Sequence, residues 1–160
     1  MTEKQLRVGA VNYLNTRPLI YGLRESAPQL DLQLDLPSRL ADGLQDGRYD
    51  IALIPSIEYA LQPSYEIVSN ACIGCRGPVL SVKLFCRVQP EKIATLALDE
   101  GSRTSAALAQ VLLHERFGIR PQLELLPLGS TIDDTNADAV LLFDYRAMHP
   151  PLKPFASVWD

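Results

Sequence analysis

The sequence predicts an α/β protein with largely parallel strands, and three features of the chain predict it. Arg7–Val11 and Tyr49–Pro55 are short and mostly apolar, which is typical of strands covered on both faces. Leu30–Leu36 alternates strictly between leucine and a polar residue, as a half-buried strand does. Segments with helical spacing separate these runs, and strands that alternate with helices favour a parallel sheet.

Helices are expected between the strands of the first half of the chain. Asn15 or Thr16 can cap a helix that has a proline in its first turn. Ser38 can cap a second helix, which Gly47 ends. Ser56–Leu61 has a helical pattern and directly follows an apolar strand.

The second half of the sequence predicts extended segments, followed by further strands with one long helix among them. The best helix in the chain is Ser105–Phe117, which Gly118 ends. The stretch Val79–Pro90 is the expected crossing point between two lobes, residues 1–85 and 86–160. The expected extended segments and strands are Tyr65–Ile73, Val79–Val88, Thr95–Leu98, Gln122–Leu126 and Ala139–Phe143.

The composition is that of an ordinary globular protein, and it limits the classes of partner. Of 160 residues, 47% are apolar and 21% are charged. The 15 basic and 19 acidic residues give a net charge of −4 without a Lys/Arg run, which argues against nucleic acid. The sequence has no apolar stretch as long as a membrane span. Met1–Arg7 has no apolar signal region, so we expect a cytoplasmic protein.

The cysteines predict neither a metal site nor a disulfide framework. Cys72 and Cys75 form a C-x-x-C pair, and Cys86 stands apart from them. A zinc site needs two further ligands, and the sequence has no second pair. The favoured interpretation is that Cys72 and Cys75 are two ordinary thiols near a turn in a reducing compartment.

Small polar residues follow three expected strands at the point where a helix begins: Asn12–Arg17, Pro55–Glu58 and Asp99–Ser105. Backbone N–H groups at a helix start can bind an anion, and ligands of open α/β sheets bind beyond the carboxyl ends of strands. The third segment is the strongest candidate; the alternative is simple capping by Ser102 or Thr104. The sequence contains no Walker lysine and no G-x-G-x-x-G, so a nucleotide site is disfavoured.

The segment Gly77–Phe85 leaves two interpretations open. Its alternation places Val82, Leu84 and Cys86 on one face, and Ser81, Lys83 and Phe85 on the other. Ser81, close to a Gly-Pro turn, can line a cleft at a strand start. The segment can equally be an edge strand with one solvated face.

Other chemistry-bearing residues favour structural roles. His114 lies within the long helix and His149 stands before two prolines, so neither spacing places a base beside a nucleophile. Glu58 is a candidate acid or base, but a carboxylate interacting with a helix dipole is the simpler interpretation. Asp133 and Asp134 indicate a solvated loop rather than a metal site.

Five segments, taken in order, resemble the chorismate dehydratases, the first enzymes of the futalosine route to menaquinone. These segments span nearly the whole chain. They are Val8–Leu19, Asp50–Tyr59, Arg76–Val82, Leu98–Ser105 and Asp138–Leu142.

This resemblance implies a fold and a reaction. The fold is that of type II periplasmic binding proteins, with two lobes and a cleft between them, used as a cytoplasmic enzyme. The enzyme is a carbon–oxygen lyase that removes water from chorismate, a small-molecule substrate, and forms 3-[(1-carboxyvinyl)oxy]benzoate. The resemblance implies no metal and no organic cofactor.

The resemblance also implies roles for individual residues. Asn15 and Ser81 match polar active-site positions and are the expected catalytic residues. The expected contacts to the two substrate carboxylates are Ser56, Ser102, Thr104 and Ser105. The matched motifs contain no strong side-chain base, so we expect the substrate's own side-chain carboxylate to take the ring proton. Asn15 and Ser81 would orient that carboxylate and the leaving hydroxyl.

Members of the resembled family are considerably longer than 160 residues. The segment that completes the first lobe is therefore expected to be missing, and exposed strand edges would favour a homodimer. Two alternatives to the dehydratase remain. One is a carboxylate-binding protein of the same fold without catalysis, and the other is the later naphthoate-forming enzyme of the same pathway.

Overall fold

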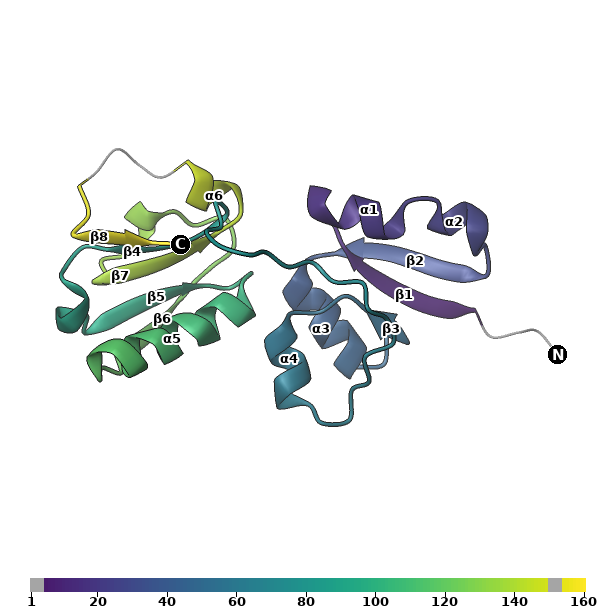
Figure 1. Ribbon diagram of the computed structural model, residues 1–160, viewed down its shortest axis with the longest axis horizontal. Helices are drawn as coiled ribbons and strands as arrows, with labels where there is room; N and C mark the ends of the chain where they lie inside the picture. The colour runs from purple at the N-terminus through teal and green to yellow at the C-terminus, as the bar shows by residue number, and fades with distance from the viewer. Residues whose placement is uncertain (1–4, 150–153) are drawn as a thin grey trace. The chain divides into compact units, whose positions relative to one another are not determined.

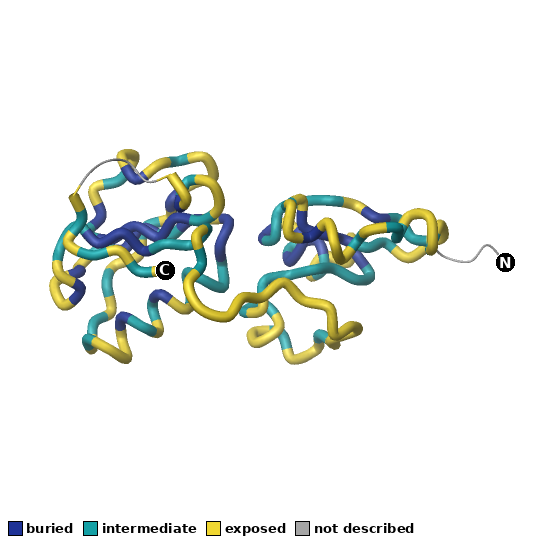
Figure 2. Tube along the Cα trace, turned by 45° about the horizontal axis from the view of Figure 1, so that its top comes forward, coloured by how far each residue is buried: buried dark blue, intermediate teal, exposed yellow. Residues whose placement is uncertain are grey.

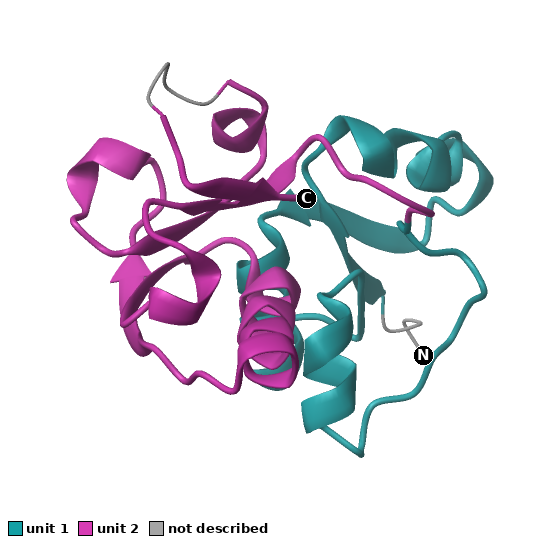
Figure 3. Ribbon diagram, turned by 60° about the vertical axis from the view of Figure 1, so that its left-hand side comes forward, with its two compact units in different colours: residues 1–74 teal, residues 75–160 magenta. Residues whose placement is uncertain are grey.

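The computed structural model describes residues 5–149 and 154–160, and it divides the chain into two compact units (Figure 3). The units are Met1–Gly74 and Cys75–Asp160, and each contains its own sheet. The division falls before the expected boundary between residues 85 and 86. That expected boundary would cut strand β4 (Val82–Cys86), which pairs along its whole length within the second unit.

The sheet of the first unit has three parallel strands in the order β2-β1-β3 (Figure 1). These strands are β1 (Leu6–Val11), β2 (Leu30–Asp35) and β3 (Ile51–Ala52). The parallel pairing confirms the prediction from the alternation of strands and helices. β3 is much shorter than the apolar run Tyr49–Pro55, because its pairing with β1 covers two positions.

The helix expected after Thr16 is broken into short pieces. Tyr21 is extended and Gly22 has a φ of 67°, so the chain turns there before a new helix begins. Backbone at positive φ is accessible to glycine at little cost. The helical segments of the first unit are η1 (Leu14–Thr16), α1 (Arg17–Ile20), α2 (Leu23–Ser26), α3 (Pro37–Gln45) and α4 (Ser56–Leu61).

Helix α3 packs closely against β1. Leu40 is fully buried, and a Cβ atom built on Gly9 would lie 2.6 Å from its Cδ2 atom. Tyr49 completes this small core from the segment that leads into β3. The N-cap of α3 is Leu36 and not Ser38, because Pro37 already occupies the first helical position, where its missing N–H costs nothing.

The sheet of the second unit has five strands in the order β6-β5-β7-β4-β8. β5 is parallel to both β6 and β7, while β4 is antiparallel to both β7 and β8. The predicted parallel arrangement is found in β6, β5 and β7, and β4 alone runs in the opposite direction to its neighbours in this sheet. The strands are β4 (Val82–Cys86), β5 (Thr95–Asp99), β6 (Gln122–Leu126), β7 (Ala139–Phe143) and β8 (Ser157–Trp159).

Apolar clusters lie on both faces of this second sheet. The buried residues of this unit follow mainly its strands along the Cα trace (Figure 2). On one face, Leu113 of α5 (Arg103–Phe117) packs into the cluster that contains Leu96. On the other face, Phe85 packs with Ala147 of α6 (Tyr145–Met148). The remaining helical turns of this unit are η2 (Pro90–Lys92) and η3 (Ile132–Asp134).

One of the two interpretations that the sequence left open for residues 77–85 is wrong. The interpretation of residues 77–85 as an edge strand with a solvated face fails, because β4 lies between β7 and β8 and Phe85 is only 1% exposed. In the first unit, the expected extended segment Tyr65–Ile73 contains no helix and joins no sheet. Helix α6 and strand β8 had no clear pattern and were not predicted. No helix in the described part of the chain is long and apolar enough to cross a membrane.

Candidate functional site

The predicted site residues divide between the two units. In the first unit, Asn15 is exposed in η1, and Ser56 is the exposed first residue of α4. In the second unit, Ser81 directly precedes β4, and Ser102 is the N-cap of α5. The remaining predicted residues lie in the first turn of α5: Thr104 and Ser105.

The predicted residues of the second unit lie at one edge of its sheet. β5 and β7 are parallel, so their carboxyl ends share this edge. β4 runs the other way, and its first residue, Val82, pairs with Phe143 at the end of β7. Ser81 therefore lies at the edge from which β5 leads into α5. We call it the carboxyl edge; ligands of open α/β sheets bind at such an edge.

Helix α5 begins at the carboxyl edge without an acidic side chain in its first turn, all of which the structure describes. Ser102 is the N-cap, and its side chain makes no capping hydrogen bond. Simple capping by the Ser102 side chain is therefore not what this helix start uses. The partial positive charge of the helix amino end has no carboxylate in the first turn, an arrangement that favours an anion.

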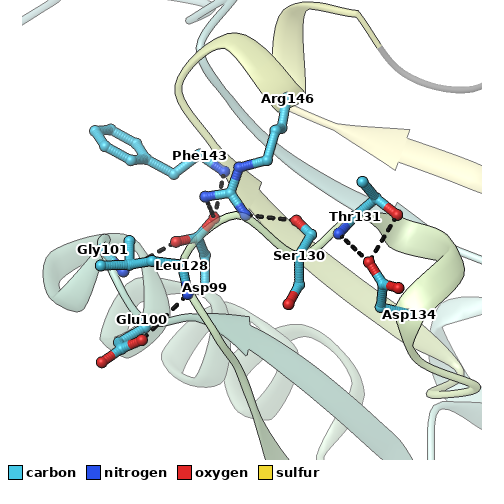
Figure 4. Close-up of polar contacts among 9 residues, drawn as sticks. All are labelled: Asp99, Glu100, Gly101, Leu128, Ser130, Thr131, Asp134, Phe143 and Arg146. Carbon is cyan, nitrogen blue, oxygen red and sulfur yellow. Dashed lines mark hydrogen bonds and ion pairs between the residues drawn. The ribbon is translucent and has the colours of Figure 1, made fainter.

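Asp99, the last residue of β5, links three segments of the carboxyl edge (Figure 4). Its Oδ1 atom accepts a hydrogen bond of 2.9 Å from the Gly101 N–H. Its Oδ2 atom accepts from the Phe143 N–H at 3.2 Å and from Nη2 of Arg146 at 2.5 Å. The Asp99 side chain is fully buried. Burial raises its pKa more than these hydrogen bonds and Arg146 lower it.

Arg146 connects Asp99 to the loop that follows β6. Its Nη1 atom donates to the Ser130 carbonyl at 2.7 Å, and its side chain is 20% exposed. The Leu128 N–H of the same loop donates to Oε2 of Glu100 at 3.1 Å. The motif Asp99–Ser105 was found from the sequence. Arg146 was missed, because it lies in a short helix that no spacing in the sequence predicts.

Asp144 fixes the position of the Ser81 main chain. Its N–H donates to the Ser81 carbonyl at 2.8 Å, at the point where β7 ends and α6 begins. Among the described residues, Asp144 is the non-glycine residue with positive φ, at 65° with ψ of −148°. This region of backbone space is almost exclusive to glycine, so the carboxyl edge contains a strained turn.

The first unit contains a mostly apolar cavity of about 670 Å³. Ser56 lines this cavity, whereas Asn15 does not. Thr16 also lines it; this residue is 1% exposed, and its hydroxyl has no hydrogen-bond partner. Most other lining residues come from β1, β3, α1, α4 and the segment from 64 to 72.

Two of the remaining candidate residues, Asp134 and His149, have structural partners. Asp134 closes the first turn of η3 by accepting from the N–H and hydroxyl of Thr131, and these hydrogen bonds lower its pKa. His149 contacts the ring of Tyr145, with centroids 4.3 Å apart. Within the described residues, no group of three or more His, Cys, Asp or Glu side chains is placed to hold a metal ion.

The cysteines are free thiols in two environments. Cys72 and Cys75 are exposed, and Cys86 is buried in the core of the second unit. Burial raises the pKa of the Cys86 thiol.

Comparison with known proteins gives a family and a fold. The family model described as menaquinone biosynthesis matches residues 6–160. The solved structure of protein AF1704 from Archaeoglobus fulgidus is similar with a TM-score of 0.66 and 17% identity. That match covers 90% of this chain and 55% of the archaeal chain.

A second solved structure is the periplasmic aliphatic sulphonate binding protein SsuA from Escherichia coli. Its TM-score is 0.52 at 17% identity, and the match covers 88% of this chain and 51% of SsuA. These similarities confirm the predicted α/β fold of the periplasmic-binding-protein type. The chain spans about half the length of these solved relatives.

Proposed function

The chain belongs to the menaquinone biosynthesis family, and on this premise we propose that it is a chorismate dehydratase. It would remove water from chorismate and form 3-[(1-carboxyvinyl)oxy]benzoate, acting as a hydro-lyase of the futalosine pathway in the cytoplasm. The observation that carries this proposal is the family match together with the carboxyl edge, where an acid-free helix start lies near hydroxyl residues. Chorismate is a dicarboxylate and needs anion-binding groups of this kind.

Each predicted residue has a role in this proposal. Asn15 and Ser81 would be the catalytic residues that orient the reacting groups. The substrate's side-chain carboxylate would take the ring proton, and the ring hydroxyl would leave and end as water. Aromatic stabilisation drives the step. The carboxylates would be bound by the remaining predicted residues: Ser56, Ser102, Thr104 and Ser105.

The experiment is a mass measurement. The chain, and a version extended to the length of the solved relatives, are incubated with chorismate, and the product mass is followed. A product that has lost one water supports the dehydratase. Unchanged chorismate with the extended version would exclude dehydration. Activity in the extended version alone would assign the reaction to the longer protein.

A second candidate is a carboxylate-binding protein without catalysis. The observation that favours it is the fold similarity to SsuA, a protein whose name describes binding of an aliphatic sulphonate. Saturable binding of chorismate, measured by calorimetry, with no change in its mass would support this candidate.

A homodimer is a further part of the proposal. β2 and β3 are the outer strands of the first sheet, and unpaired strand edges are able to pair with another chain. Light scattering at several protein concentrations tests it; a monomer mass at every concentration would refute it.

A further inference from the structure

Asp99 is the point at which the parts of the carboxyl edge are joined. Its side chain receives hydrogen bonds from the turn before α5, from the end of β7 and from α6. Its carbonyl also accepts from the Ser102 N–H at 3.2 Å. Both the main chain and the side chain of one residue therefore hold the start of α5.

Stability alone does not explain a buried carboxylate here. Taking a carboxylate and a guanidinium out of water costs several kcal/mol, and replacing such a pair with apolar residues is often neutral or stabilising. The Asp99–Arg146 pair instead fixes directions, because Arg146 has a planar fork that reaches Asp99 and the Ser130 carbonyl together. A pair of this kind determines where the loops it joins are placed.

The turn that Asp99 holds has little freedom to move. A Cβ atom on Gly101 would lie 3.2 Å from Cδ2 of Leu128 and 3.3 Å from Oδ1 of Asp99. Phe143, which donates to Asp99, is followed directly by Asp144, which donates to the Ser81 carbonyl. One short series of contacts thus connects Asp99 both to the start of α5 and to Ser81.

We propose that Asp99, paired with Arg146, is a positioning residue that sets the geometry of Ser81 relative to the hydroxyl residues at the start of α5. It touches no substrate atom and acts through the residues it holds. The effect of Asp99 on turnover rests on the proposed function, whereas its effect on the positions of Ser81 and the start of α5 does not.

The test compares Asp99→Asn with a matched control, Asp138→Asn. Asp138 directly precedes β7 and accepts from the N–H groups of Ala94 and Thr95, so it joins β7 to β5 at the opposite edge. Each substitution replaces a carboxylate that connects β5 and β7 with a neutral amide. They differ in which edge of the sheet they disturb.

The first readout is the set of backbone amide chemical shifts in the folded variants. We expect D99N to shift the amides of Ser81 and of residues 101–105, and D138N to leave these amides in place. Unmoved amides at residues 101–105 in D99N, or equal shifts in D138N, would overturn the inference. This readout requires no substrate, so it decides the inference even where chorismate is not converted.

The second readout is turnover of chorismate by the longest active form of the protein, below the unfolding temperature of every variant. A misplacement of about 1 Å can cost about 100-fold in rate, so kcat/KM is expected to fall at least about tenfold in D99N. It is expected to fall less than about twofold in D138N, with the same folded fraction. Equal losses in both variants would contradict positioning, and no turnover by the unaltered protein would refute the dehydratase alone.

A second variant covers the case in which D99N does not fold. Arg146→Lys keeps the positive charge beside Asp99 but loses the fork to Ser130. The same amides are expected to shift in R146K, with a smaller loss of kcat/KM than in Arg146→Met. Identical spectra and kinetics for R146K, R146M and the unaltered protein would refute a positioning role for the Asp99–Arg146 pair.

Discussion

Asp99 and Asp138 join the same two strands, β5 and β7, from opposite ends. Asp99 ends β5 and accepts from the Phe143 N–H of β7, while Asp138 precedes β7 and accepts from the Thr95 N–H of β5. Their surroundings differ. Burial raises the pKa of Asp99, whereas the hydrogen bond from the Ala94 N–H and further donors lower the pKa of Asp138.

The two carboxylates are expected to give opposite dependences of stability on pH. The contribution of Asp99 is greatest below its unfolded pKa of 3.8 and is lost as pH rises through its higher folded pKa. The contribution of Asp138 is present above 3.8 and is lost as pH falls through its lower folded pKa. Urea unfolding from about pH 3 to about pH 7 measures both. The destabilisation caused by D99N should shrink as pH rises, and that caused by D138N should grow; parallel curves would contradict this.

Gly9→Ala is expected to lower the free energy of unfolding by about 1–3 kcal/mol. The new methyl group would lie 2.6 Å from Leu40 Cδ2 and 3.3 Å from the Tyr49 ring, in the core of the first unit. Gly74→Ala is the matched control, since nothing lies within 4 Å of its Cβ position. Equal unfolding free energies for the two variants, measured in urea, would show that the core yields without cost.

Asp144→Gly is expected to raise the free energy of unfolding by about 1 kcal/mol, because it relieves a conformation that suits glycine. The N–H that bonds to the Ser81 carbonyl is retained in this variant. Gly118→Ala is the opposite control: Gly118 ends α5 with a φ of 68°, and alanine there should destabilise by about 1 kcal/mol. A D144G variant less stable than the unaltered protein would show that the Asp144 side chain contributes more than the strain costs.

Substitutions at the proposed active site should separate binding from catalysis. Ser102→Ala removes one hydrogen bond to a carboxylate, worth about 1.5–3 kcal/mol, so KM for chorismate should rise about tenfold or more. Asn15→Ala and Ser81→Ala should mainly lower kcat. The control is Ser26→Ala, at an exposed residue in α2. Unchanged turnover in both N15A and S81A would remove these two residues from the mechanism.

The elements with strong periodicity were predicted well from the sequence. Ser56–Leu61, Gln122–Leu126 and Ala139–Phe143 have the bounds that their apolar patterns indicated. The helix after Thr16 was predicted less well, because Gly22 interrupts it where a propensity argument sees a continuous apolar stripe. The bounds of these elements depend on residues only a few positions away in the sequence, so local patterns are sufficient to predict them.

The contacts that connect the segments of the carboxyl edge were not predictable from local sequence patterns. Asp99 and Arg146 are separated by 47 positions, and no local spacing relates them. Ser81 was picked out by a motif, but its proximity to the end of β7 follows from the antiparallel pairing of β4, where a parallel sheet was expected. Long-range pairing, rather than propensity, determines which polar residues share an edge.

Because both faces of the second sheet are covered, its inner strands are expected to resist local unfolding. β4, β5 and β7 are inner strands, with a pairing partner on each side and an apolar cluster on each face. Amide protons of such strands exchange with solvent mainly through large-scale unfolding, so we expect β4, β5 and β7 to contain the slowest-exchanging amides of the chain. In the described part of the first unit, the buried core is the small cluster around Leu40, and this unit is expected to open at lower free energy.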